Sequence, residues 1–85
     1  MTVKISDYNI DKTKIITLAD QIIAKCNELL LEESLEAGHD FFSSVKDNCS
    51  SMKCLVIKLG VGTKNQLKAL KNMDRGVASW EAKLP

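Results

Sequence analysis

Residues 60–64 read Gly-Val-Gly-Thr-Lys and follow a short apolar run, a pattern that also begins many phosphate-binding loops. A dinucleotide-binding fingerprint needs a third glycine at the position of Asn65. A P-loop needs a longer loop that ends in lysine followed by serine or threonine. Both motifs are incomplete, so we interpret the two glycines as the end of one helix and the approach to the next. No cofactor and no small-molecule ligand is predicted.

Three cysteines are the strongest nucleophiles in the sequence. Cys26 and Cys49 lie on apolar helix faces and are predicted to be small core residues. Cys54 lies on the polar side of its helix, where Lys53 and Lys58 would favour the thiolate. No base is evident for Cys54. The chain has one histidine and no Cys-x-x-Cys pair, so no zinc site is predicted.

The single histidine, His39, is followed by Asp40. Neighbouring residues rarely form a working acid–base pair, so we predict a surface histidine. A phosphotransfer histidine on a helical bundle is the alternative, but Phe42 and Ser43 stand where lysine and glycine would be expected. The sequence therefore predicts no catalytic residues and no enzymatic activity.

Two charged groups are candidate binding surfaces. A basic stripe is formed by Lys64, Lys68, Lys71 and Arg75, which would fall within about 60° on one helix face. It is either a solvated face, a surface that binds an acidic protein, or a surface that binds nucleic acid or anionic lipid. The acidic cluster would suit the same stripe on another copy, which would produce self-association. The acidic cluster is Glu28, Glu32, Glu33, Glu36 and Asp40.

Composition limits the class of protein that can present these residues. The 85 residues are 45% hydrophobic and 27% charged, as in a globular chain, and suffice for a single domain. No apolar stretch approaches the roughly 18–20 residues of a membrane span. The first residues lack a signal-peptide pattern, so a cytoplasmic location is expected. Net charge is −4 over residues 1–42 and +5 over residues 43–85.

Apolar residues recur at helical spacing from Ile15 to Leu30, which predicts a first helix at about residues 11–33, capped by Asn9 or Asp11. A second helix is predicted at about residues 35–59, after a reversal within residues 33–40. Residues 1–9 are expected to form an arm or a short strand.

Residues 53–59 decide the fold class. Their local propensity suits a strand, but they continue the helical phase that begins at Phe41, and a sustained period outweighs propensity. Gly60 would end this helix, and Thr63 with Gln66 would form a capping box for a third helix at about residues 64–82. Gly76 inside that helix predicts a close helix crossing or a bend.

We therefore predict an all-α fold, a small antiparallel three-helix bundle. The alternative is an α+β domain with strands near residues 2–6 and 53–60. A bundle without an obvious cleft favours a non-enzymatic protein–protein interaction module, either a small adaptor, an inhibitor or an assembly protein, and a homodimer is one form of it. A nucleic-acid-binding protein that uses the basic stripe is the competing hypothesis. Ile23, Leu31 and Ile57 are candidates for exposed apolar contacts.

Overall fold

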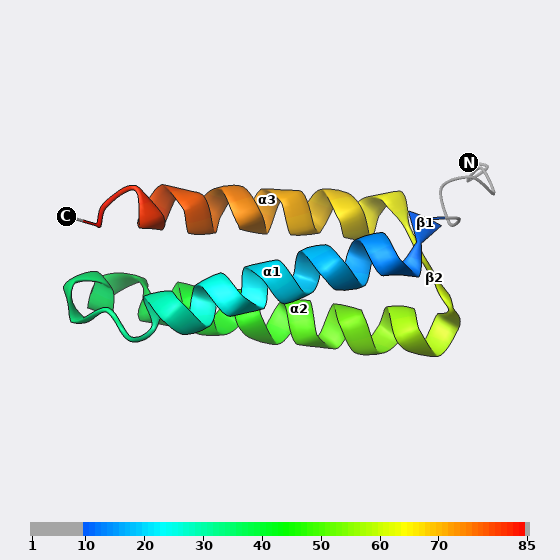
Figure 1. The fold of residues 1–85 in the computed structure, drawn as a ribbon, viewed down its shortest axis with the longest axis horizontal. Coiled ribbons are helices and arrows are strands. Elements are labelled where there is room, and N and C mark those ends of the chain that lie inside the picture. The colour runs from blue at the N-terminus through cyan, green and yellow to red at the C-terminus, as the bar shows by residue number, and fades with distance from the viewer. Residues whose placement is uncertain (1–9, 85) are drawn as a thin grey trace.

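The computed structural model describes residues 10–84, and it confirms the predicted antiparallel three-helix bundle (Figure 1). Helices α1 (Lys12–Leu29), α2 (His39–Leu59) and α3 (Lys64–Glu81) run along one long axis, with α2 opposite in direction to the other two. A 3-10 helix, η2 (Glu33–Gly38), joins α1 to α2. Residues 53–59 are helical, so the alternative strand at residues 53–60 does not form. The expected arm or strand at residues 1–9 lies outside the described residues.

The break between the first two helices differs from the prediction by about four residues on each side. Helix α1 ends at Leu29, where the Leu30 N–H still donates to the Cys26 carbonyl at 2.9 Å. Residues 33–38 form η2 instead of the first turn of α2. The interruption allows Leu35 to turn inward, where it is buried in the core.

A two-residue pairing that the sequence pattern does not predict closes the opposite end of the bundle. Strand β1 (Ile10–Asp11) pairs antiparallel with β2 (Val61–Gly62). Each strand leads directly into a helix, so the pairing holds the beginnings of α1 and α3 side by side (Figure 1).

Both helices that begin at this end carry the predicted caps. The Asp11 side chain accepts a hydrogen bond from the Thr13 N–H at 2.9 Å, and this bond holds the pKa of Asp11 below its usual value. Thr63 and Gln66 form the complete capping box, with bonds of 3.1 and 2.8 Å. These bonds satisfy N–H groups that no helical carbonyl can reach.

Gly60 ends α2 in the left-handed conformation, with φ of 80°, and its N–H donates to the Val56 carbonyl. This region is open to glycine and costly for residues with a Cβ. The glycine therefore terminates the helix, as predicted, and turns the chain toward β2.

The core is aliphatic and centred on α1, which packs closely against both α2 and α3. One aromatic cluster completes it near η2, where the buried Phe42 packs edge-to-face against Trp80 with ring centroids 5.7 Å apart. Lys83 places its ammonium 3.9 Å from the centre of the Trp80 ring. The fully buried larger side chains are Ile15, Ile22, Cys26, Phe42, Cys49, Val56, Leu70 and Val77.

Candidate functional site

The four residues of the basic stripe are all exposed on α3. Their spacing of three and four residues keeps them on one face of the helix, as the sequence predicts. The stripe begins at Lys64, at the end of the bundle that holds β1 and β2. It runs from there along the first two-thirds of α3.

The five residues of the acidic cluster are also exposed, but they gather at the other end of the bundle. Glu28 lies in the last turn of α1, Asp40 lies in the first turn of α2, and the three remaining glutamates lie in and before η2. The stripe and the cluster therefore originate at opposite ends of the molecule (Figure 1).

This separation belongs to a wider division of charge along the long axis. Residues 10–20 and 49–72 form the half that holds β1 and β2, and they carry seven lysines and two aspartates, a net charge of +5. Residues 21–48 and 73–84 form the half that holds η2, and they carry four basic and eight acidic residues, a net charge of −4. The bundle is thus basic at one end and acidic at the other.

The dipoles of α1 and α3 reinforce this division, whereas that of α2, which runs in the other direction, opposes it. Lys12 and Lys14 lie in the first turn of α1, and Lys64 begins α3, so each sits at the positive end of a helix dipole. Glu28 sits at the negative end of α1. Such placements weaken an isolated helix by a few tenths of a kcal/mol each. Helix stability therefore does not explain these charges.

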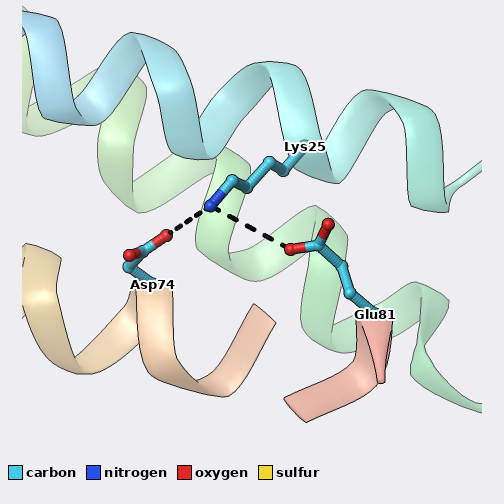
Figure 2. Close-up of polar contacts among 3 residues, drawn as sticks. All are labelled: Lys25, Asp74 and Glu81. Carbon is cyan, nitrogen blue, oxygen red and sulfur yellow. Dashed lines mark hydrogen bonds and ion pairs between the residues drawn. The ribbon is translucent and has the colours of Figure 1, made fainter. Parts of the chain in front are cut away.

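Each ion pair between helices in the described part of the chain has one partner on α1. Lys25 of α1 bonds Asp74 of α3 at 3.1 Å and lies 4.0 Å from Glu81 (Figure 2). The hydrogen bond with Asp74 raises the pKa of Lys25 above its usual value. Lys53 of α2 pairs with Asp20 of α1. These contacts fasten α2 and α3 to α1, but neither of them joins α2 to α3.

Helices α2 and α3 approach each other closely at few points. Toward η2 they meet where the Phe41 ring lies against Gly76, so closely that a Cβ on residue 76 would be 2.8 Å from the Phe41 Cζ atom. Gly76 thus permits a close helix crossing, one of the two roles predicted for it. Beyond that contact the two helices leave a groove between them.

The groove has a volume of about 460 Å³, and α1 contributes nothing to its lining. Its surface is mostly apolar, and Leu55, one of its lining residues, is 48% exposed. Residues on both helices supply polar groups, but none of the lining residues is charged. The lining residues are Asn48, Ser51, Met52, Leu55, Gln66, Ala69 and Met73.

Sequence reasoning missed this groove because it predicted a bundle without an obvious cleft. Met52 and Met73 pack partly against the core, whereas Leu55 is exposed. A signal was present in the apolar arc of α2, which is wider than one neighbouring helix can cover. Of the predicted exposed apolar residues, Leu31 and Ile57 are exposed at 83% and 58%. The prediction for Ile23 was wrong, because its side chain is partly buried against the core.

The three cysteines and His39 do not come together into one site in the part of the chain that the structure describes. Cys26 and Cys49 are buried as predicted, and burial raises the pKa of both thiols, that of Cys49 to about 11. Cys54 is exposed and lines a second pocket of about 450 Å³, together with Leu55 and Lys58. The His39 ring bonds the Glu32 main-chain carbonyl at 3.0 Å and so ties the start of α2 to the segment before η2.

Comparisons with protein-family models, curated proteins and solved structures give no match to this chain. Within residues 10–84, no group of three or more His, Cys, Asp or Glu side chains is arranged to hold a metal ion. Over the same residues, none of the helices has both the length and the apolar character needed to cross a membrane.

Proposed function

We propose that the chain is a non-enzymatic protein–protein interaction module that binds its partner along the groove between α2 and α3. The observation that carries this proposal is the exposure of an uncharged, mostly apolar channel between two helices of a small bundle. Grooves of this kind accept the apolar face of another helix. Cytoplasmic location belongs to the same proposal, since free cysteines suit a reducing compartment.

The side chains of the groove suit recognition of a protein surface. Leu55 supplies exposed apolar area, and each 100 Å² removed from water contributes about 2.5 kcal/mol to binding before the costs of association. Met52 and Met73 line the same groove, and methionine adapts its shape to the surface that it meets. The Asn48 side chain can fix the orientation of the partner, and so can the Gln66 side-chain NH2 group, since only the Gln66 oxygen is held in the capping box.

The histidine and the two buried cysteines are poorly suited to catalysis. The His39 ring is engaged by a main-chain carbonyl. Cys26 and Cys49 are buried thiols whose raised pKa disfavours the nucleophilic thiolate. The proposed module would act through surface complementarity alone.

Affinity capture with matched variants tests the proposal. Ala69→Glu places a charge in the groove, whereas Ala24→Glu makes the same substitution at an exposed position of α1. We expect the wild-type chain and Ala24→Glu to retain the same proteins from a host lysate, and Ala69→Glu to lose them. Retention of an identical set by Ala69→Glu would overturn the assignment of the groove.

Nucleic-acid binding through the basic stripe is a second candidate function. The observation in its favour is the exposure of all four stripe residues, three of which lie in the half of the bundle with net charge +5. Phosphate contacts make such binding steeply dependent on salt. A variant with Glu at Lys64, Lys68, Lys71 and Arg75 should then lose salt-dependent retention on DNA or RNA. Absence of retention at low salt for the wild-type chain would remove this candidate.

A further inference from the structure

We propose that the occupant of the groove is a second copy of this chain, in a two-fold symmetric dimer whose long axes are antiparallel. The proposal rests on the proposed function, because it takes the groove between α2 and α3 as the binding surface. Three observations carry it, namely the absence of charge in the groove, the division of charge along the bundle and the size of the face.

The uncharged lining is what self-docking requires. At a two-fold axis each residue lies close to its own copy, so a charged residue there would meet a like charge. None of the seven lining residues is charged. Leu55 and the two methionines would instead meet apolar side chains of the second copy.

The charged ends select the orientation. A two-fold axis parallel to the helices would place the two basic halves together and the two acidic halves together. An axis perpendicular to the helices would place the half with net charge +5 of each copy beside the half with net charge −4 of the other copy. Opposite potentials at these contacts favour the antiparallel dimer and disfavour the parallel one.

The face that holds the groove is large enough for a stable interface. The bundle measures 45 × 23 × 17 Å, and its three helices run along the longest dimension (Figure 1). A standard interface takes about 800 Å² from each partner. The chain exposes 5810 Å² in total, so such an interface would cover a minor part of its surface.

Sedimentation across a concentration series, in the presence of a reductant, tests the dimer. We expect the wild-type chain and Ala24→Glu to reach twice the 9.4 kDa chain mass and to stop there. Ala69→Glu should shift dissociation to at least tenfold higher concentration. Leu55→Lys should do the same, and Leu55 is exposed enough for the fold to tolerate the change. Circular dichroism of each variant verifies that the helices are intact.

Two sedimentation results would overturn the dimer. One is a monomer throughout the micromolar range. The other is growth beyond a dimer that disappears with added salt, because the basic stripe meeting the acidic cluster of the next copy would give an open, head-to-tail assembly. A dimer that neither groove variant weakens would overturn the groove as its interface.

Spin-label distances test the orientation. Ser34 is exposed in η2, at the acidic end, and Ser34→Cys in a Cys54→Ser background offers one accessible thiol among the residues described. In the antiparallel dimer the two labels should lie at least as far apart as most of the 45 Å length of the bundle. A separation of less than half that length would overturn the antiparallel arrangement.

Different results would overturn the dimer and the proposed function. A monomeric chain that still captures another protein, with capture lost in Ala69→Glu, would overturn the dimer and leave the interaction module intact. A monomeric chain whose captured proteins are unaffected by Ala69→Glu would overturn both.

Discussion

Cys26 and Cys49 show how position in the fold sets the chemistry of identical side chains. Both thiols are fully buried. Burial is the main reason that the pKa of Cys49 rises to about 11, and the nearby Cys26 adds to the effect. Cys54, five residues from Cys49, faces solvent instead. The three thiols should therefore differ in reactivity.

The first prediction concerns thiol labelling. In the folded protein near pH 7.5, a water-soluble disulfide reagent should modify one thiol quickly, and Cys54→Ser should abolish that fast phase. Cys26 and Cys49 should react only when the chain unfolds, because the reagent needs an accessible thiolate. Absorbance of the released chromophore measures both phases. Fast labelling of two or three thiols would contradict the buried positions of Cys26 and Cys49.

The second prediction concerns stability in alkali. The folded pKa of Cys49 is about 11, against a usual value of 9.0. Between these values the unfolded chain has released the proton and the folded chain still holds it, so the free energy of unfolding falls as pH rises. The contribution of Cys49 is intact below pH 9, and its loss is on the order of 2 kcal/mol by pH 11.

Urea denaturation at pH 8, 9.5 and 10.5 measures this loss. Lysines titrate in the same range, so the comparison is with Cys49→Ala, which lacks the thiol. We expect a shallower decline for the variant than for the wild-type chain. Parallel declines would show that Cys49 does not contribute.

At the scale of elements, the turn from α2 to β2 depends on one backbone conformation. Gly60 has φ of 80°, and no atom lies within 4 Å of the place where a Cβ would stand. A substitution there is therefore opposed by backbone strain rather than by a clash.

The third prediction follows from this distinction. Gly60→Ala should lower the free energy of unfolding by about 1 kcal/mol, because alanine disfavours the left-handed region. Gly60→Asn should cost less, since asparagine tolerates that region. Chemical denaturation of the three chains gives the order. Equal stability of the alanine variant and the wild-type chain would contradict the role of Gly60 as the helix stop.

Helices that are marked by apolar periodicity or by capping residues could be predicted from the sequence. The helical phase from Phe41 to Leu59 identified residues 53–59 as helix, and Thr63 with Gln66 marked the start of α3. The end of α1 could not be placed, because residues 30–33 keep ordinary helix formers and contain no glycine or proline. The pairing of β1 with β2 joins residues about fifty positions apart, and two-residue strands carry no period to detect.

At the scale of the whole molecule, α1 is the helix on which the other two depend. It packs against both α2 and α3 and bonds both through Asp20 and Lys25, whereas α2 and α3 approach each other closely at few points. Exposing the backbone of α1 requires the loss of both interfaces. Helix α3 can separate with the loss of one.

The fourth prediction is an order of protection in native-state hydrogen exchange. Amides in the middle of α1 should exchange most slowly, near the rate set by global unfolding. Amides of α3 should exchange faster, and Lys25→Met should speed α3 further by removing the link to Asp74 and Glu81. Mass spectrometry of peptides from each helix gives the rates. Slower exchange in α3 than in α1 would contradict this hierarchy.

The groove and the charged ends of the bundle could not be predicted from the sequence. A helical period reveals which side of α2 is apolar, but not whether a neighbour covers all of it, so the exposure of Leu55 was not predicted. Charge along the sequence was correctly seen as uneven. Its direction in space could not be known until α2 and α3 were placed in opposite directions, which puts the end of α2 and the beginning of α3 at the same end of the bundle.

The aromatic cluster near η2 also gives the protein an optical reporter. Trp80 is the single tryptophan of the chain, and it packs against Phe42 with the Lys83 ammonium over its ring. Its fluorescence should therefore be sensitive to events at the acidic end of the bundle, where the end of α3 meets the start of α2. Separation of α3 from that end should shift the emission to longer wavelength, while the helical circular dichroism of α1 and α2 persists.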